Sequence, residues 1–166
     1  MLLIFEKWKD LSFSQLMNVY EESNRENGEE FWPYLNESQR ILLAEQDFYQ
    51  YLREVFFSTA HARYFVWEEM GCYVSALRLE PYRDGMLLEA LETAPYHRKK
   101  GYAATLIRGV QQVCPGAKIY SHVGKRNTAS LRTHESCGFR RIAEHAVFAD
   151  GSVNSRCCTL CWEGKQ

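Results

Sequence analysis

The turn at residues 98–103 constrains the fold more than any other part of the sequence. Arg98-Lys99-Lys100-Gly101-Tyr102-Ala103 follows a predicted strand over residues 86–93 and opens a predicted helix over 101–114. The start of a helix exposes unpaired N–H groups and the positive end of the helix dipole, which together suit a phosphate group. Gly101 lets the backbone approach such a ligand closely. We therefore interpret the turn as a phosphate site, although three adjacent cations alone would also suit a solvated basic turn.

Hydrophobic periodicity divides the rest of the chain into strands and helices around this turn. The predicted strands are 1–8, 62–68, 72–79, 86–93, 117–123, 140–148 and 153–162, and the predicted helices are 12–27, 36–57, 101–114 and 127–137. The strand–helix–strand unit around Gly101 implies a parallel pair, whereas the hairpins imply antiparallel neighbours. These features predict an α+β fold: a mixed, mostly antiparallel sheet flanked by helices, in a single domain over residues 1–166.

Short polar signals mark the ends of these helices. Ser12 and Asn36 each begin a sequence with capping-box spacing, and Asn127 suits an N-cap. Gly28 is the predicted end of the first helix, and Gly138 suits the left-handed residue that follows the last one.

Composition excludes several classes of function. The formal net charge of the 166-residue chain is −1 and no long basic run occurs, so a nucleic-acid partner is not expected. No apolar stretch approaches the roughly 20 residues needed to cross a bilayer, and the first residues do not form a signal peptide. We therefore expect no membrane partner and a cytoplasmic location. The C-x-x-C spacing within residues 157–161 lacks a second pair, which favours buried thiols over a zinc site, so no metal is expected.

The motifs around the turn resemble the GNAT superfamily of N-acetyltransferases. Residues 98–103 match its signature Arg/Gln-x-x-Gly-x-Gly/Ala in the Ala form, and Asn127-x-x-Ser130 and the segment 134–139 follow at the family's usual distance. The predicted order of elements also agrees, so the resemblance covers nearly the whole chain. It implies a GNAT-like acyl-CoA N-acyltransferase fold, in which a parallel pair of strands splays open and acetyl-CoA binds in the opening as co-substrate.

The resemblance also implies the contacts with the cofactor. The strand over residues 86–93 would present backbone groups to the pantetheine arm, the turn would wrap the pyrophosphate, and Asn127 would hydrogen-bond near the pantetheine or acetyl end. The implied cofactor-binding residues are Leu91, Thr93, Arg98, Lys99, Lys100, Gly101, Tyr102, Ala103, Ala104, Asn127 and Ser130.

Acyl transfer to an amine needs a group that removes a proton, because an alkyl ammonium has a pKa of about 10.4. Glu89 occupies the strand position where many family members carry a catalytic glutamate, so we interpret it as a base acting through a water; a glutamate facing solvent is equally compatible. Strand alternation predicts that Glu92 points to the opposite face. His134 stands where many members have a tyrosine that protonates the departing thiolate, so it is the candidate acid, with a packed histidine and an acid role for Tyr120 as the alternatives.

The acceptor is less constrained by the sequence. Family members usually build the acceptor site from the first two helices and their connection, which here carries Phe31, Trp32 and Tyr34 among carboxylates. These residues suit a cationic amine, although the rings would also serve to cover the core. The sequence predicts an acetyl-CoA-dependent N-acetyltransferase that acts by direct transfer on a small amine or on a peptide or protein amino group. A CoA-binding domain without turnover, another acyl-CoA and a homodimer formed through edge strands stay open as alternatives.

Overall fold

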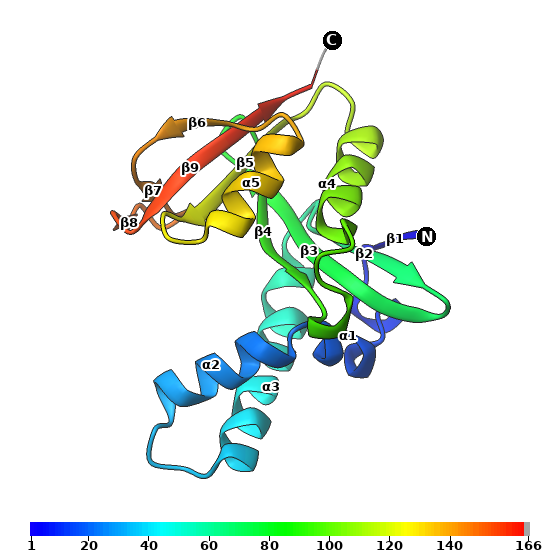
Figure 1. The fold of residues 1–166 in the computed structure, drawn as a ribbon, viewed down its shortest axis with the longest axis vertical. Helices are drawn as coiled ribbons and strands as arrows, with labels where there is room; N and C mark the ends of the chain where they lie inside the picture. Colours follow the sequence, from blue (N-terminus) through cyan, green and yellow to red (C-terminus); the bar gives the residue numbers. More distant parts are fainter. Residues whose placement is uncertain (165–166) are drawn as a thin grey trace.

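The main feature of the fold is a mixed sheet with helices on both faces (Figure 1). The computed structural model describes residues 1–164, and within them the sheet has seven strands in the order β1-β2-β3-β4-β5-β9-β6. The strands are β1 (Leu2–Phe5), β2 (Arg63–Glu69), β3 (Cys72–Tyr82), β4 (Gly85–Thr93), β5 (Lys118–Gly124), β9 (Cys157–Glu163) and β6 (Arg140–Ala143). Every neighbouring pair is antiparallel except β4 and β5, which are parallel. The predicted fold class is therefore confirmed.

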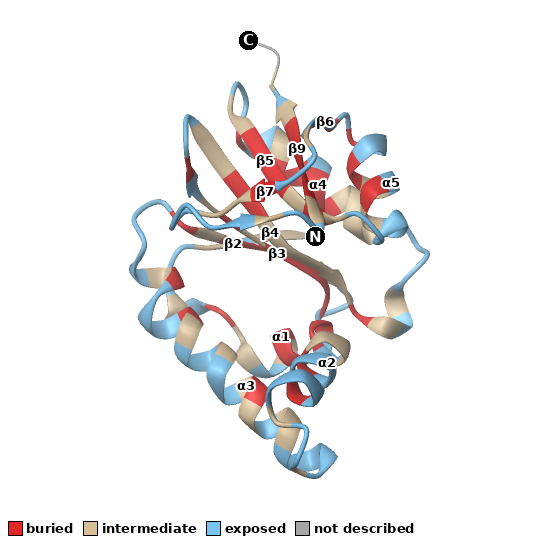
Figure 2. Cartoon of the chain, turned by 90° about the vertical axis from the view of Figure 1, so that its left-hand side faces the viewer, coloured by how far each residue is buried: buried red, intermediate tan, exposed pale blue. Residues whose placement is uncertain are grey.

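Each face of this sheet packs into its own hydrophobic cluster. The helices are α1 (Phe13–Val19), α2 (Glu21–Phe31), α3 (Glu37–Glu54), α4 (Tyr102–Val113) and α5 (Thr128–Ser136). Phe65 of β2 packs with α4 and α5, whereas its neighbours Tyr64 and Val66 pack with α1 and α3, because successive side chains of a strand point to opposite faces. Figure 2 shows the buried residues along the central strands, while much of the α2–α3 hairpin is exposed.

The predicted first helix is wrong in two respects. It is divided at Tyr20 into α1 and α2, and Gly28 lies inside α2 instead of ending it. A Cβ on Gly28 would lie 2.8 Å from the Cβ of Arg40, so this glycine allows α3 to pack closely against α2. Ser12 also makes no side-chain cap, because Gln15 instead accepts a hydrogen bond from the N–H of Tyr73 at 3.0 Å.

The C-terminal strands are shorter than predicted. The predicted strand over residues 140–148 is divided into β6 and β7 (Ala146–Val147), and the predicted strand over 153–162 is divided into β8 (Val153–Asn154) and β9. β7 and β8 leave the main sheet and form a two-stranded ribbon. Thr159 of β9 holds the connection, since its hydroxyl donates to the carbonyl of His145 at 2.7 Å.

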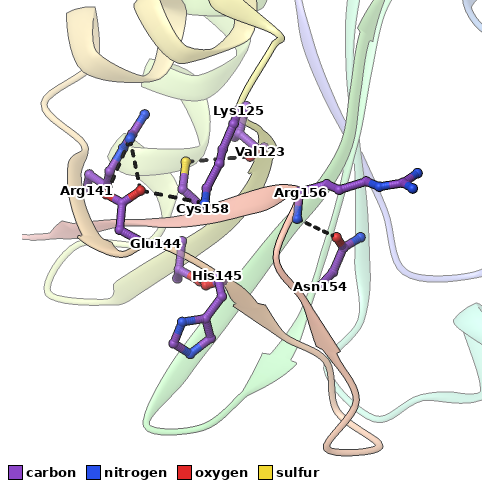
Figure 3. A network of polar contacts seen from close by, with 9 residues as sticks. Val123, Lys125, Arg141, Glu144, His145, Asn154, Arg156 and Cys158 are labelled. Atoms are coloured by element: carbon purple, nitrogen blue, oxygen red, sulfur yellow. Dashed lines mark hydrogen bonds and ion pairs between the residues drawn. The ribbon is translucent and has the colours of Figure 1, made fainter.

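Polar contacts fix the end of β5 against the segments beside it (Figure 3). Lys125, which follows β5, pairs with Glu144 at 3.7 Å, and Glu144 also pairs with Arg141 at 3.4 Å. The Sγ of Cys158 donates to the carbonyl of Val123 at 3.5 Å. Because these contacts lie on the β9 side, the other edge of β5 is left to face β4.

The parallel pair is short, and this shapes the molecule. β4 and β5 are paired only from Met86 with Ile119 to Leu88 with Ser121. Both strands continue beyond that point, to Thr93 and to Gly124, without pairing to each other. An opening therefore lies between the carboxyl ends of two parallel strands, which is where ligands bind in many α/β sheets. Among residues 1–164, no helix is both long and apolar enough to span a bilayer.

Candidate functional site

The predicted phosphate turn leads directly into α4. Gly101 is the N-cap of α4 and has a φ of 82°, and Lys99 also has a positive φ of 61°. The first hydrogen bond of the helix runs from the N–H of Thr105 to the carbonyl of Gly101, at 3.0 Å. The N–H groups of Tyr102, Ala103 and Ala104 therefore precede the helical hydrogen-bonding pattern and can bind an anion.

The cations of the turn do not act alike. The side chain of Arg98 turns back to the sheet, where its Nε donates to the carbonyl of Thr93 at 3.2 Å and its guanidinium pairs with Glu22 of α2. Lys99 and Lys100 are exposed. Arg98 thus holds the turn in place, while the two lysines and the backbone are left to meet an anion.

A cleft of about 170 Å³ occupies the opening between β4 and β5. Its walls are the segments 88–91 and 121–124, and α5 contributes the remaining side. It brings together five residues that the sequence predicted for the site: Glu89, Leu91, Asn127, Ser130 and His134. Asn127 also caps α5 as predicted, since its Oδ1 accepts from the N–H of Ser130 at 3.0 Å. Thr93 lies outside the cleft, and its hydroxyl is 3.0 Å from that of Ser75.

A β-bulge in β4 changes the face of the sheet on which the later side chains of this strand lie. Arg78 of β3 pairs with Glu89 and Ala76 pairs with Glu92, so β4 carries one extra residue between these pairs. Ala90, within the bulge, has a positive φ of 49°. Because Ala76 and Arg78 share one face of β3, Glu92 lies on the same face as Glu89. The prediction that Glu92 points to the opposite face is therefore wrong.

Two tyrosines hold the bulge from the side of α1. The hydroxyl of Tyr20 donates to the carbonyl of Ala90 at 2.6 Å, and the hydroxyl of Tyr64 donates to that of Tyr20 at 2.9 Å. Burial raises the pKa of both phenols, so they stay protonated and able to donate. No sequence pattern predicts this contact, because tyrosines with helical or strand periodicity are typical core residues.

Glu89 is the candidate base, and it faces the partly buried cation of Arg78. Its carboxylate lies 3.8 Å from the guanidinium of Arg78, which stacks over the ring of Tyr51 at 4.8 Å. Glu80 lies in the same group, and burial together with the charge of Glu89 raises the pKa of its carboxyl. Arg78 therefore balances two carboxylates on the face that α1–α3 cover.

His134 is buried in α5 with a defined tautomer. Its Nδ1 lies 2.8 Å from the carbonyl of Ser130, which can only accept, so Nδ1 carries the proton. Burial lowers the pKa of the imidazole, which is consequently neutral at pH 7 with a bare lone pair on Nε2. In that state Nε2 has no proton to give, so the acid role stays a prediction that requires a second protonation. Tyr120, the alternative acid, lies outside the cleft and hydrogen-bonds Asp84.

A second pocket, of about 360 Å³, lies on the face of the sheet that α1–α3 cover, between the sheet and the α2–α3 hairpin. It meets the cleft at Ala90, which lines both. Its polar lining includes Glu92, whose pKa burial raises, and Asp47. Of the three predicted acceptor residues, Phe31 and Trp32 line the pocket, whereas Tyr34 is 79% exposed and does not.

The cysteines of the C-x-x-C spacing are part of the sheet. Cys157, Cys158 and Cys161 lie on β9, with Cys158 and Cys161 buried. Within residues 1–164 no three His, Cys, Asp or Glu side chains are grouped closely enough to hold a metal ion.

Solved structures with the same fold include several acetyltransferases. The PaiA N-acetyltransferase from Thermoplasma acidophilum, in complex with coenzyme A, is 11% identical with a TM-score of 0.61 over 98% of this chain and 99% of that one. The ribosomal-protein-S18-alanine N-acetyltransferase from Escherichia coli is 15% identical with a TM-score of 0.59, covering 100% and 96%. Spermidine N-acetyltransferase from Vibrio cholerae, with CoA and spermine, is 22% identical with a TM-score of 0.57, covering 98% and 95%. At these identities the likeness concerns the fold.

The sequence itself matches a family model. No curated protein matches the chain. The model described as Acetyltransferase (GNAT) family matches residues 14–139, which include α1 from its second residue, α2–α5, the turn before α4 and all the residues that line the cleft. The resemblance predicted from residues 98–139 is thereby confirmed, and the chain belongs to the GNAT family of acetyltransferases.

Proposed function

We propose that this protein transfers the acetyl group of acetyl-CoA to a primary amine. The observation that carries the proposal is the meeting of three features at one place: the free N–H groups at the start of α4, the parted ends of β4 and β5, and a separate acidic pocket that reaches the same bulge. A thioester held from one side of the sheet and an amine held from the other would then meet at Ala90.

The cofactor would lie along the turn and the end of β4. The N–H groups of residues 99–104 and the side chains of Lys99 and Lys100 would bind the pyrophosphate, with Arg98 fixing the turn. Leu91 and Thr93 would present backbone groups to the pantetheine arm, while Asn127 and Ser130 would lie near its far end. These assignments rest on the family resemblance and on the cleft that five of the predicted site residues share.

The acceptor pocket suits a positively charged amine. Asp47 and Glu92 supply two carboxylates against the one cation of the lining, Arg78, and Phe31 and Trp32 supply aromatic faces that attract cations. Two of the similar structures are named for acetylating spermidine and an alanine of a ribosomal protein. A polyamine and a peptide with an N-terminal alanine therefore represent the small-amine and the protein branches of the proposal.

Glu89 would help to remove the proton of the acceptor amine. It lines the cleft at the point where the strands part, and its carboxylate is on the face from which the amine would arrive.

Thiol release with acetyl-CoA, measured with spermidine and with an alanine-starting peptide, tests the activity. Propionyl-CoA and succinyl-CoA in the same assay test the acyl group. CoA binding without thiol release from any mixture would favour the CoA-binding domain without turnover.

Glu89→Gln should lower kcat at pH 7 about 10-fold or more and leave acetyl-CoA binding unchanged. Glu80→Gln is the matched control, because Glu80 also lies beside Arg78 but does not line the cleft. If both variants keep the wild-type kcat, Glu89 takes no part in the reaction.

A further inference from the structure

His122 of β5 is a half-buried imidazole whose two ring nitrogens are shielded from solvent. In the part of the chain that the structure describes, neither Nδ1 nor Nε2 of this ring has a hydrogen-bond partner, although both atoms are shielded from solvent. Shielded polar atoms in folded proteins nearly always have a hydrogen-bond partner, so a ring without one calls for an explanation. The ring also lines the cleft between β4 and β5. A neutral imidazole has one ring nitrogen with a free lone pair, and in a predicted reaction cleft that nitrogen can accept a proton.

The register places His122 beside Glu89. Leu88 and Ser121 form the last pair of the parallel ladder, so Glu89 and His122 are the next residues on the two strands. Leu87 and Tyr120, two positions earlier, pack together on one face. By alternation Glu89 and His122 point to that same face. The two side chains therefore stand on adjacent strands at the point where the strands part.

The surroundings hold the ring in one orientation. Tyr82 of β3 and Phe148 meet it edge to face, each with ring centroids 5.4 Å away and planes at 87°. The charged groups that act on it are Glu89 from β4 and Arg83 from the β3–β4 turn. His134 of α5 also lines the cleft. A fixed ring with one carboxylate beside it resembles the arrangement in which an imidazole accepts a proton and the carboxylate stabilises the imidazolium.

Glu89 is less free to act as the base than the imidazole. It forms the ion pair with Arg78 and shares that cation with Glu80. Burial lowers the pKa of His122, whereas the charge of Glu89 raises it. The imidazole is thus neutral at pH 7, and the carboxylate of Glu89 stabilises its positive charge when it accepts a proton.

We propose that His122 accepts the proton of the acceptor amine and that Glu89 acts through it as a positioning and charge-stabilising residue. This inference rests on the proposed acetyl transfer. The ammonium first loses one proton to solvent, which frees the lone pair of its nitrogen. The amine nitrogen then forms a bond with the thioester carbonyl carbon, and a second N–H proton passes to a ring nitrogen of His122. The C–S bond breaks with its electron pair on the CoA sulfur, which takes a proton from water. The imidazolium then returns its proton to solvent.

Nuclear magnetic resonance of the histidine rings tests the arrangement without any acceptor. His122 should titrate below the ordinary pKa of about 6.5, and Glu89→Gln should lower its pKa further by removing a negative neighbour. Arg83→Gln should raise the pKa by removing a positive one. An unchanged titration in Glu89→Gln would show that the carboxylate does not act on the ring and would overturn the pairing.

Kinetics test the catalytic role with spermidine and the alanine-starting peptide. His122→Gln should lower kcat at pH 7 by about 100-fold or more and abolish the acidic limb of the pH profile, with the KM for acetyl-CoA unchanged. His122→Asn is a second variant, whose amide lies nearer the position of the Nδ1 atom of the imidazole. With two variants, the test does not depend on the folding of either one alone. The exposed His145→Gln is the matched control.

The outcomes separate the two proposals. Turnover by the wild-type protein together with normal turnover by His122→Gln would overturn the role of His122 and leave acetyl transfer intact. If the wild-type protein acetylates neither amine, the proposed function fails, and the reaction that His122 would serve fails with it. A loss of kcat in both His122→Gln and His122→Asn, with an unaltered pH profile, would show that His122 has only a structural role.

Discussion

At the level of single residues, a comparison of Gly101 with Gly71 tests how much the turn before α4 contributes to cofactor binding. Gly101 and Gly71 both have a positive φ, of 82° and 79°, and a Cβ added to either would meet no atom of the described chain within 4 Å. Alanine at either position should therefore cost a similar backbone strain, about 1–2 kcal/mol. Only Gly101 begins the helix that would bind the pyrophosphate.

Gly101→Ala should therefore weaken CoA binding about 10-fold or more, whereas Gly71→Ala should leave it unchanged. The stabilisation of each variant by added CoA measures this, because a ligand at 100 times its Kd raises the free energy of unfolding by about 2.7 kcal/mol. Equal stabilisation of both variants would show that the backbone around residue 101 does not approach the cofactor.

Helix caps offer a second matched pair, at the level of elements. Asn36 caps α3 and Asn127 caps α5, and in both cases Oδ1 accepts from a backbone N–H at 3.0 Å. Asn36→Ala and Asn127→Ala should each lower the free energy of unfolding by about 1 kcal/mol. Only Asn127→Ala should also raise the KM for acetyl-CoA, since Asn127 alone lines the cleft. A raised KM in both variants would attribute the effect to general destabilisation.

Elements that depend on neighbours in sequence could be predicted, and elements that depend on distant contacts could not. The caps at Asn36 and Asn127 involve residues three positions away, so the sequence alone predicted them correctly. Ser12 and Gly28 carry similar signals, but Tyr73 engages Gln15 and Arg40 packs on Gly28. Those partners are brought close only by the tertiary fold, and they decide the outcome.

The candidate site follows the same division. The family resemblance singled out the turn, Glu89, Asn127 and His134 because its motifs lie in continuous stretches of sequence, and the last three line one cleft. The bulge at Ala90 could not be foreseen, since strict alternation assumes a strand with no extra residue. His122 was hidden for another reason: a histidine in a strand shows nothing of whether its nitrogens find partners.

At the scale of the whole molecule, stability should depend on the protonation of buried histidines. Burial lowers the pKa of His134, so below pH 6.5 the unfolded chain binds a proton more readily than the folded one. The free energy of unfolding should therefore fall as the pH falls through 6.5. Glu92 acts in the opposite direction, because burial raises its pKa and acidification relieves the buried charge.

A comparison with His134→Gln isolates the contribution of this histidine. Between pH 7.5 and pH 5.5, the wild-type protein should lose about 1 kcal/mol more of its unfolding free energy than the variant loses. Urea denaturation at the two pH values measures the difference. Identical losses would mean that His134 is protonated as easily in the folded protein as in the unfolded chain.

The order of the strands also governs how the sheet can be assembled. β9 lies between β5 and β6 but follows both of them along the chain. During folding, β5 therefore keeps one bare edge, and β6 has no neighbour to pair with, until this later segment inserts between them. The half of the sheet built from β1–β4 contains two local hairpins and can form first, whereas the other half must wait for a contact that is distant along the chain. Intermediates that lack β9 would expose the β5 edge to pairing with other chains, which makes this insertion the step most vulnerable to aggregation.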